Sequence, residues 1–451
     1  MLSFWILGAS VLAWRLYVSY SHFSKVPKGI PWSNCRCPTP YLFAQIAGVW
    51  NNPAAMNKAY QKYCKKGLLC AVALPFSRPD ILLPKSYIRW MASQNDRILS
   101  PTPVQHEIVG AKYAFLDSSV EKDFAVNDIL RVHLNRRLPR LVPKIMEELS
   151  TSIGDTFGLD TEWKEVQVIP LVRRVIAKVT AWLIIGDELC RDDELVDNLA
   201  KFSNAVIPSA TGLSLFPSFL QPISSRLTSI INHIYMRRAL KSLGPYIEQR
   251  IVAMETGIFK DDAIDDVLTW HIHEALRKKE PRDGLEDVIA CRIFATMFAA
   301  LGSPTLTMTH TLFNLCVNLP PGHVWRFLEE EGRRVFASSI DQASINDLEY
   351  ADSAIKETLR LHTAIKALSG QVMQPAGLTL KDHNMHLRQG SRISVSAWGI
   401  HHDEDIYPDA YLYDPYRSTG VRPLASDKAA RLIAANPSFL GGSENNQNTI
   451  V

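Results

Sequence analysis

One apolar segment of helical character, Leu285–Leu319, limits more than any other feature what this chain can fold into. It is long enough to cross a bilayer, which takes roughly 20 apolar residues in a helix. Arg292, Asn314 and many Ser and Thr side chains interrupt it, however, and such groups are costly against lipid. We therefore expect a long helix through the core of a globular body, with a membrane span as the alternative.

Helical patterning surrounds this segment. Apolar residues recur at three- and four-residue spacing from Glu121 to about Leu319. Shorter apolar runs between turn residues predict strands at Leu68–Leu74 and Ile81–Leu83, and again after Leu380. The sequence thus predicts a mainly α-helical fold with small β-sheets formed from both ends of the chain. The clearest helical stretches are Asn57–Lys65, Leu138–Leu149, Val168–Leu183 and Leu227–Met254.

The N-terminus is apolar and is followed by a basic, proline-rich joint. Leu2–Trp14 carries no charge, and the apolar run reaches Tyr20 if Arg15 extends toward the lipid headgroups. This pattern predicts that residues 1–20 form a membrane anchor and that residues 21–34 form a hinge. The Lys residues of the hinge predict that the body faces the cytosol. A cleaved secretory signal is the alternative.

Composition excludes several classes of protein. A net charge of +3 gives no electrostatic reason to expect nucleic acid as a partner, and 47% hydrophobic residues suffice for a large core. The mean hydropathy of −0.04 excludes a protein made mostly of membrane spans. Seven irregularly spaced cysteines are typical of a reduced chain rather than of a disulfide framework or a zinc site.

Two short motifs of the C-terminal part combine charge with a defined turn. Glu357 and Arg360 lie three residues apart on one face of a predicted helix and can pair. Elsewhere in the chain the same spacing is most simply interpreted as solvent-exposed pairs. In the second motif, Tyr-Asp-Pro-Tyr-Arg, Pro415 fixes a turn and places Arg417 on irregular backbone just beyond it.

A third motif is rich in histidine. His401-His402-Asp403 is followed by Ile-Tyr-Pro, and His383 and His386 lie nearby. A zinc hydrolase is one interpretation of these residues. Their spacing fits no standard zinc signature, so we expect no metal ligands here.

Taken in order, the three motifs resemble the C-terminal half of a cytochrome P450, which carries a Glu-x-x-Arg helix, an H-x-D-P-x-x-Y/F-P stretch and an F-D-P-x-R-F turn. Glu357, Arg360 and Arg417 match the family's structural Glu-Arg-Arg triad residue by residue. The resemblance implies the cytochrome P450 fold, a heme cofactor, and monooxygenation with dioxygen and electrons from NADPH-cytochrome P450 reductase. The residues within the motifs are most similar to those of fungal secondary-metabolism members, including terpenoid oxidases. This similarity implies a lipophilic small-molecule substrate and a location at the endoplasmic reticulum membrane.

The same resemblance implies positions next to the heme. Arg131 aligns with the arginine that usually contacts a heme propionate. Ala299 and Ala300 open the oxygen-activating segment, in which Ser303 replaces the family's threonine and Gly302 replaces its acid. Ser303 is therefore the expected residue at the oxygen-activation position.

One departure concerns the heme ligand itself. Beyond the Arg417 turn the family places a loop whose cysteine thiolate binds the iron. Here Phe439-Leu440-Gly441 resembles the opening of that loop, a polar tail follows, and no cysteine comes after Cys316. We expect residues 35–437 to form an incomplete P450-like catalytic domain, residues 438–451 to be an atypical tail, and the chain to be truncated before its ligand. The alternative to an active monooxygenase is a catalytically inactive homologue or binding protein.

Overall fold

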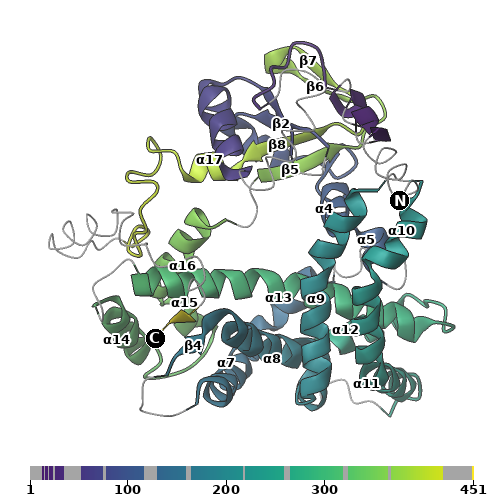
Figure 1. Ribbon diagram of the computed structural model, residues 1–451. Helices are drawn as coiled ribbons and strands as arrows, with labels where there is room; N and C mark the ends of the chain where they lie inside the picture. The colour runs from purple at the N-terminus through teal and green to yellow at the C-terminus, as the bar shows by residue number, and fades with distance from the viewer. Residues whose placement is uncertain are drawn as a thin grey trace, which may run out of the picture. The chain divides into compact units, whose positions relative to one another are not determined.

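The computed structural model describes residues 13–14, 16–18, 20–23, 26–34, 52–74, 78–115, 129–158, 164–216, 219–258, 265–317, 323–363, 367–419 and 449–450. They fall into two compact units. The first is formed by residues 1–111, 207–229 and 363–411, and the second by residues 112–206, 230–362 and 412–451. Helices predominate, and the strands form small sheets (Figure 1). The predicted fold class, mainly α with small β-sheets, is confirmed.

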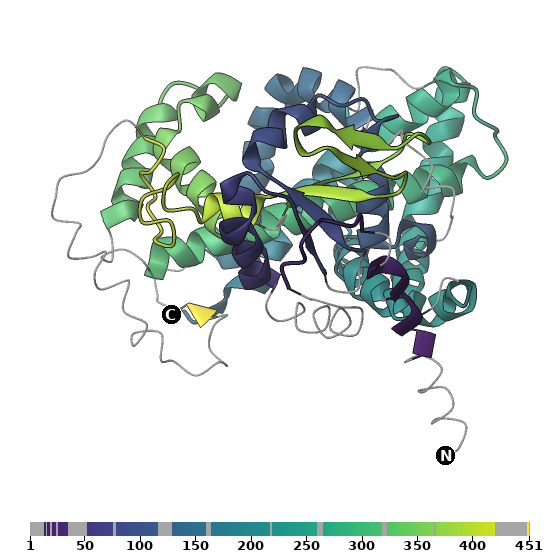
Figure 2. The ribbon, with the colours of Figure 1, turned by 90° about the horizontal axis from the view of Figure 1, so that it is seen from above.

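The first unit is built on a sheet that joins distant parts of the chain. Its strands lie in the order β1-β2-β8-β5-β3, and only the β2–β8 pair is parallel. Figure 2 shows early strands in purple beside late strands in green. The sheet therefore combines both ends of the chain, as the sequence predicted. Its strands are β1 (Cys70–Val72), β2 (Asp80–Leu83), β3 (Leu99–Ser100), β5 (Ala367–Val372) and β8 (Arg392–Ser396).

Every residue of the central strands β2 and β8 is buried, although β2 contains Asp80 and three of the five residues of β8 are polar. Asp80 lies opposite Arg392 in the register, and Nε of Arg392 is 3.1 Å from Oδ1 of Asp80. Ser394 also donates a hydrogen bond to the Asp80 carboxylate. Both charged side chains are buried. The sheet can accommodate them because each has a partner on the neighbouring strand.

A helix over residues 52–62 packs on this sheet through a cluster that includes Met56, Tyr60 and Leu82. The predicted helix Asn57–Lys65 is thus longer toward its N-terminus and ends in the 3-10 turn η1 (Cys64–Lys66). The other described elements of the unit are η2 (Lys85–Tyr87), α3 (Ile88–Ala92), α4 (Thr102–Val109), α10 (Gln221–Thr228), β6 (Leu378–Leu380), η5 (Lys381–His383), β7 (Met385–Leu387) and α17 (Ala397–His401).

The second unit is organised around α13 (Leu285–Val317), the long helix near the middle of Figure 1. Among the described residues it is the one helix long and apolar enough to span a membrane, yet 56% of its apolar window is buried. Arg292 lies inside the unit and pairs with Glu280 at 3.0 Å. This burial agrees with the prediction of a core helix. The helices packed against α13 are α8 (Val168–Leu189), α11 (Ile230–Glu255), α12 (Val267–Arg277) and α16 (Glu349–Leu361).

The remaining elements of the second unit surround this centre. α7 (Asn135–Phe157) packs on α8 and extends the predicted helix Leu138–Leu149 in both directions. Two elements, α5 (Ala111–Ala114) and α9 (Asp193–Ser214), have residues in both units. The others are the π-helix η4 (Leu130–Leu134), β4 (Val166–Gln167), α14 (His323–Val335), α15 (Gln342–Asn346) and β9 (Thr449–Ile450).

One predicted helix is wrong. The stretch Leu227–Met254 is not continuous, because α10 ends at Thr228 and α11 begins at Ile230. Ser229 between them is buried, and its ψ of 7° leaves the helical range. The apolar spacing remains in phase across the break, so periodicity alone could not reveal it. The predicted anchor, residues 1–20, lies mostly outside the described residues.

Candidate functional site

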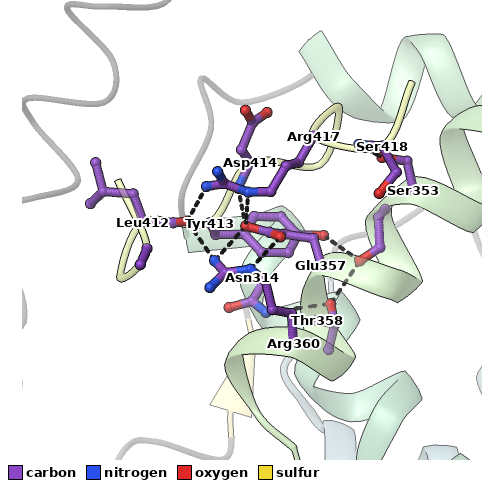
Figure 3. Close-up of polar contacts among 12 residues, drawn as sticks. Asn314, Ser353, Glu357, Thr358, Arg360, Leu412, Tyr413, Asp414, Arg417 and Ser418 are labelled. Atoms are coloured by element: carbon purple, nitrogen blue, oxygen red, sulfur yellow. Dashed lines mark hydrogen bonds and ion pairs between the residues drawn. The ribbon is translucent and has the colours of Figure 1, made fainter. Parts of the chain in front are cut away.

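A buried carboxylate held by two guanidinium groups forms the centre of the candidate site (Figure 3). Nε of Arg360 donates to Oε2 of Glu357 at 2.7 Å, and Nε of Arg417 donates to Oε1 at 2.9 Å. The side chains of Glu357, Arg360 and Arg417 are 2%, 5% and 16% exposed. The structure therefore brings together all three residues of the triad that the resemblance implied.

Backbone groups complete the coordination. The amide of Asp414 donates to Oε1 of Glu357 at 3.2 Å, and both arginines donate to the carbonyl oxygen of Leu412, at 3.3 and 3.2 Å. Each polar group in the centre thus has a partner, which buried charges require. The site fixes the segment from Leu412 to Arg417 against α16.

Tyr413 adds a second attachment between the turn and α16. Its hydroxyl donates to the carbonyl oxygen of Ala354 at 3.1 Å, and the amide of Ser418 donates to Oγ of Ser353 at 3.0 Å. The backbone amide of Arg417 closes the turn on the Asp414 carbonyl at 3.0 Å, as expected for a turn around proline. α16 therefore holds the turn at several points.

The electrostatics of the triad suit a structural role. Burial by itself raises the pKa of Glu357, but the hydrogen bonds and positive charges of Arg360 and Arg417 outweigh it and leave the pKa below its usual range. Burial raises the pKa of Tyr413, so its phenol stays protonated. With its pKa lowered, Glu357 is charged at neutral pH and acts as a cross-link between the two arginines.

Asn314 links α13 to this centre, and sequence reasoning did not assign it that role. Its Nδ2 donates to Oγ1 of Thr358 at 3.5 Å, and its Oδ1 lies 3.2 Å from Nε2 of His362. The ring of His362 stacks on that of His310 at a centroid distance of 4.4 Å. An amide in an otherwise apolar helix was the signal that could have identified this contact.

The predicted oxygen-activation segment forms an open face of α13. Ala299, Gly302 and Ser303 are exposed, and Ala300 is half-buried. A Cβ added at Gly302 would meet nothing within 4 Å. Leu306, one turn further, is also exposed, so this side of the helix is a small, mostly apolar surface with one hydroxyl.

Arg131, the predicted propionate contact, lies in η4. Its side chain lies outside what the structure describes, so its role stays a prediction.

The histidine motif belongs to the first unit and serves in packing. His402 is buried and stacks on Trp398 at 4.1 Å. Asp403 accepts hydrogen bonds from Tyr60 at 2.8 Å and Lys65 at 2.5 Å, which joins the segment after α17 to the helix over residues 52–62 and to η1. In the described part of the chain, no three His, Cys, Asp or Glu side chains are placed to hold a metal ion. The zinc interpretation thus gains no support.

The heme implied by the resemblance fits these residues only in part. The residues that the resemblance places beside the heme, Ala299, Gly302 and Ser303, are exposed on α13, and nothing lies within 4 Å of a Cβ added at Gly302. The described cysteines of the second unit are Cys190 and Cys291, which are buried, and Cys316, which is exposed. Cys291 and Cys316 lie 12 and 13 residues from Ser303 (303 − 291 and 316 − 303) on the same helix, about 18 and 20 Å along its axis. Neither Cys291 nor Cys316 therefore lies beside Ser303, and neither could supply a thiolate to a heme placed against that face.

Comparison with known proteins identifies the family. The family model described as Cytochrome P450 matches residues 127–419, which include the whole triad. The chain is 31% identical over 397 residues to cytochrome P450 monooxygenase ecdH of Aspergillus rugulosus, covering 87% of this chain and 78% of ecdH. It is 30% identical over 401 residues to cytochrome P450 monooxygenase gloO of Glarea lozoyensis, covering 87% and 76%.

Among solved structures, the retinoic acid-bound cyanobacterial CYP120A1 matches with a TM-score of 0.54 and 17% sequence identity, over 80% of this chain and 76% of that chain. At this identity the match supports the fold alone. The family match and the two fungal relatives show that this chain belongs to the cytochrome P450 family.

Proposed function

We propose that this protein acts in fungal secondary metabolism as a heme-thiolate monooxygenase homologue that oxidises a lipophilic small molecule with dioxygen. The similarity to ecdH, 31% identity over 87% of this chain, carries the proposal. Heme is the family's cofactor and supplies the oxygen chemistry when bound. The residues within the C-terminal motifs favour a terpenoid as the substrate class.

In this proposal the open face of α13 borders the reaction space. Ala299, Ala300 and Gly302 leave room for a planar cofactor, and Ser303 offers the hydroxyl at the oxygen-activation position. Arg131 would bind a propionate. The Glu357 triad acts as a positioning cross-link that holds the turn before the expected ligand loop.

The proposed domain layout places the protein at the endoplasmic reticulum membrane. Residues 1–20 form the anchor, residues 21–34 the hinge, residues 35–437 the catalytic body and residues 438–451 the tail. The uncharged run from Leu2 to Trp14 supports the anchor, and the Lys residues that follow favour a body facing the cytosol.

NADPH-cytochrome P450 reductase is the proposed electron donor. Exposed positive charge on α7 supports docking of an acidic partner surface there, because charge complementarity speeds encounter and selects partners. The exposed side chains are those of Arg136, Arg140 and Lys144.

A second candidate is a homologue that binds ligands without oxygen chemistry. The observation that favours it is that Cys291 and Cys316, the described cysteines of α13, lie about 18 and 20 Å along the helix from Ser303. A reduced carbon monoxide difference spectrum of the 451-residue protein separates the candidates. The thiolate-type Soret band would establish the monooxygenase, and its absence in a folded protein that still binds lipophilic ligands would establish the second candidate.

A further inference from the structure

Two buried cysteines of the first unit lie close together, Cys64 in η1 and Cys70 in β1. They are 2% and 0% exposed, and both belong to the apolar cluster that packs the helix over residues 52–62 on the sheet. Neither belongs to the triad or to α13, so the proposed function does not use them. Two neighbouring thiols are a site for oxidation, because the sulfenic acid of one can condense with the other to a disulfide.

The local fold brings the two cysteines together although they stand six positions apart (70 − 64). The helical segment that contains Cys64 ends at Gly67, whose φ of +77° is left-handed. The amide of Gly67 donates to the carbonyl oxygen of Cys64 at 3.1 Å, and the amide of Leu68 donates to that of Tyr63 at 3.1 Å. This pair of hydrogen bonds is a helix C-terminal cap that reverses the chain. The reversal returns Cys70 to the end of the helix.

The contacts of the Cys70 sulfur place it beside Cys64. Its Sγ lies 3.9 Å from the carbonyl oxygen of Ala59, which also accepts the amide of Tyr63 at 3.1 Å. The sulfur therefore lies over the helical turn that leads into Cys64. The pKa of Cys70 lies far above its usual range, first because its thiol hydrogen-bonds to the thiol of Cys64 and then because it is buried. Thiols in such contact need only a small rotation to reach the S–S bond length of about 2.0 Å.

The chain between the two cysteines is an exposed turn. Lys65, Lys66 and Gly67 are exposed, and Leu68 is 51% exposed although it is apolar. Exposed turns open locally at a much lower cost in free energy than the core does. Opening of this turn would bring both sulfurs into reach of a small oxidant, because both are attached to the segment that moves.

We propose that Cys64 and Cys70 form a reversible oxidation site that takes a hydroperoxide as its oxidant. The thiolate of Cys64 attacks one peroxide oxygen, the O–O bond breaks, and water or an alcohol leaves, which gives a sulfenic acid at Cys64. The thiol of Cys70 then attacks this sulfur, the S–O bond breaks, and the proton of the thiol leaves with the oxygen as water. Two thiols lose two electrons and two protons to form the disulfide, and the peroxide is reduced.

The surroundings of the two sulfurs set this order of events. The raised pKa keeps Cys70 protonated, and a thiol is a much weaker nucleophile than a thiolate. Cys64 therefore reacts first, and Cys70 resolves its sulfenic acid. The disulfide joins the end of the helix to β1, and thiol exchange with a dithiol reductant restores the pair.

The test uses the folded 451-residue chain with hydrogen peroxide as the probe. After treatment, free thiols are alkylated with iodoacetamide in denaturant, and the chain is digested with trypsin. Trypsin cuts after Lys65 and Lys66, so the disulfide would join peptide 63–65 to peptide 67–85, with a mass two hydrogen atoms below the sum of the two. We expect this cross-linked pair after peroxide and its loss after dithiothreitol.

Serine variants test the order of the two steps. Cys70→Ser removes the resolving thiol, so dimedone should label the sulfenic acid of Cys64 after peroxide. Cys64→Ser should leave Cys70 unlabelled and recovered in alkylated form. The control is Cys316→Ser, which removes an exposed cysteine of α13 and should form the cross-link as the wild type does. The melting temperature of each variant shows whether it is folded.

Recovery of Cys64 and Cys70 in alkylated form, at a peroxide dose that oxidises the exposed Cys316, would overturn the proposal. A disulfide that joins Cys64 to Cys35 or Cys37 instead of Cys70 would also overturn it, because the site would then have a different partner. Dimedone labelling of Cys70 in folded Cys64→Ser would contradict the assigned order of reaction.

Discussion

Nε of Arg417 lies 2.9 Å from Oε1 of Glu357, although 60 residues separate them in the chain. The contact joins an irregular turn to the middle of α16, and Arg360 completes the pair of guanidiniums on the same carboxylate. A buried carboxylate with its partners in place holds the turn against the helix. If one partner is removed, the carboxylate stays buried with its charge incompletely compensated.

Removal of Arg417 should therefore be strongly destabilising. We expect Arg417→Ala to lower the free energy of unfolding by about 3–5 kcal/mol, measured by denaturant unfolding. Lys356→Ala on the same helix is the control, because the Lys356–Asp352 pair is exposed on both sides and contributes about 0.5 kcal/mol or less. Equal effects of the two substitutions would contradict the role of the triad.

The triad should also make stability depend on pH. Its arginines keep the pKa of Glu357 below the value of the unfolded chain, about 4.3. The stabilisation is then fully present above that value and is lost as the pH falls through the lower folded-state pKa. Unfolding midpoints of the wild type and of Glu357→Gln, measured between neutral and acidic pH, should converge as the pH falls. A constant difference between them at all pH values would refute this account.

Gly186 in α8 is expected to tolerate no side chain. Its φ of +87° disfavours L residues, and an added Cβ would lie 2.6 Å from Oδ2 of Asp266. Asp266 caps α12 and pairs with the buried Arg250 at 2.7 Å, so it cannot withdraw without cost. Gly186→Ala should destabilise the protein by about 2 kcal/mol or more, measured by thermal unfolding.

Gly154 in α7 provides the matched control. It has ordinary helical backbone, and a Cβ there would meet nothing within 4 Å. Gly154→Ala should stabilise the protein by about 0.5–1 kcal/mol through helix propensity. If both glycine substitutions shifted the melting temperature in the same direction, the argument from the close approach to Asp266 would fail.

Deleting residues 1–26 should release the protein from carbonate-washed membranes into the soluble fraction. The reason is that an uncharged helix of this length partitions into the bilayer core, whereas a surface contact does not survive the wash. Fractionation followed by immunoblotting measures the outcome. Carbonate-resistant association of the shortened protein would show that residues 2–20 are not the anchor.

The sequence by itself determined features that depend on local spacing. The long apolar run, interrupted by polar residues, identified α13 as a core helix. Each polar side chain in such a run disfavours contact with lipid, whereas the apolar side chains favour burial. The order of the three motifs identified the members of the triad. The spacing of Glu357 and Arg360 already places them on one helix face, so their pairing needs no information from the rest of the fold.

Only the tertiary structure decided how distant segments meet. The Leu412 carbonyl and the Asp414 amide complete the shell around Glu357, and backbone groups leave no trace in the side-chain pattern. The parallel pairing of β2 with β8 and the role of Asn314 likewise depend on which segments lie next to each other. The break at Ser229 was not predicted, because the apolar spacing continues across it. The backbone leaves the helical conformation at this residue without any change in the side-chain pattern.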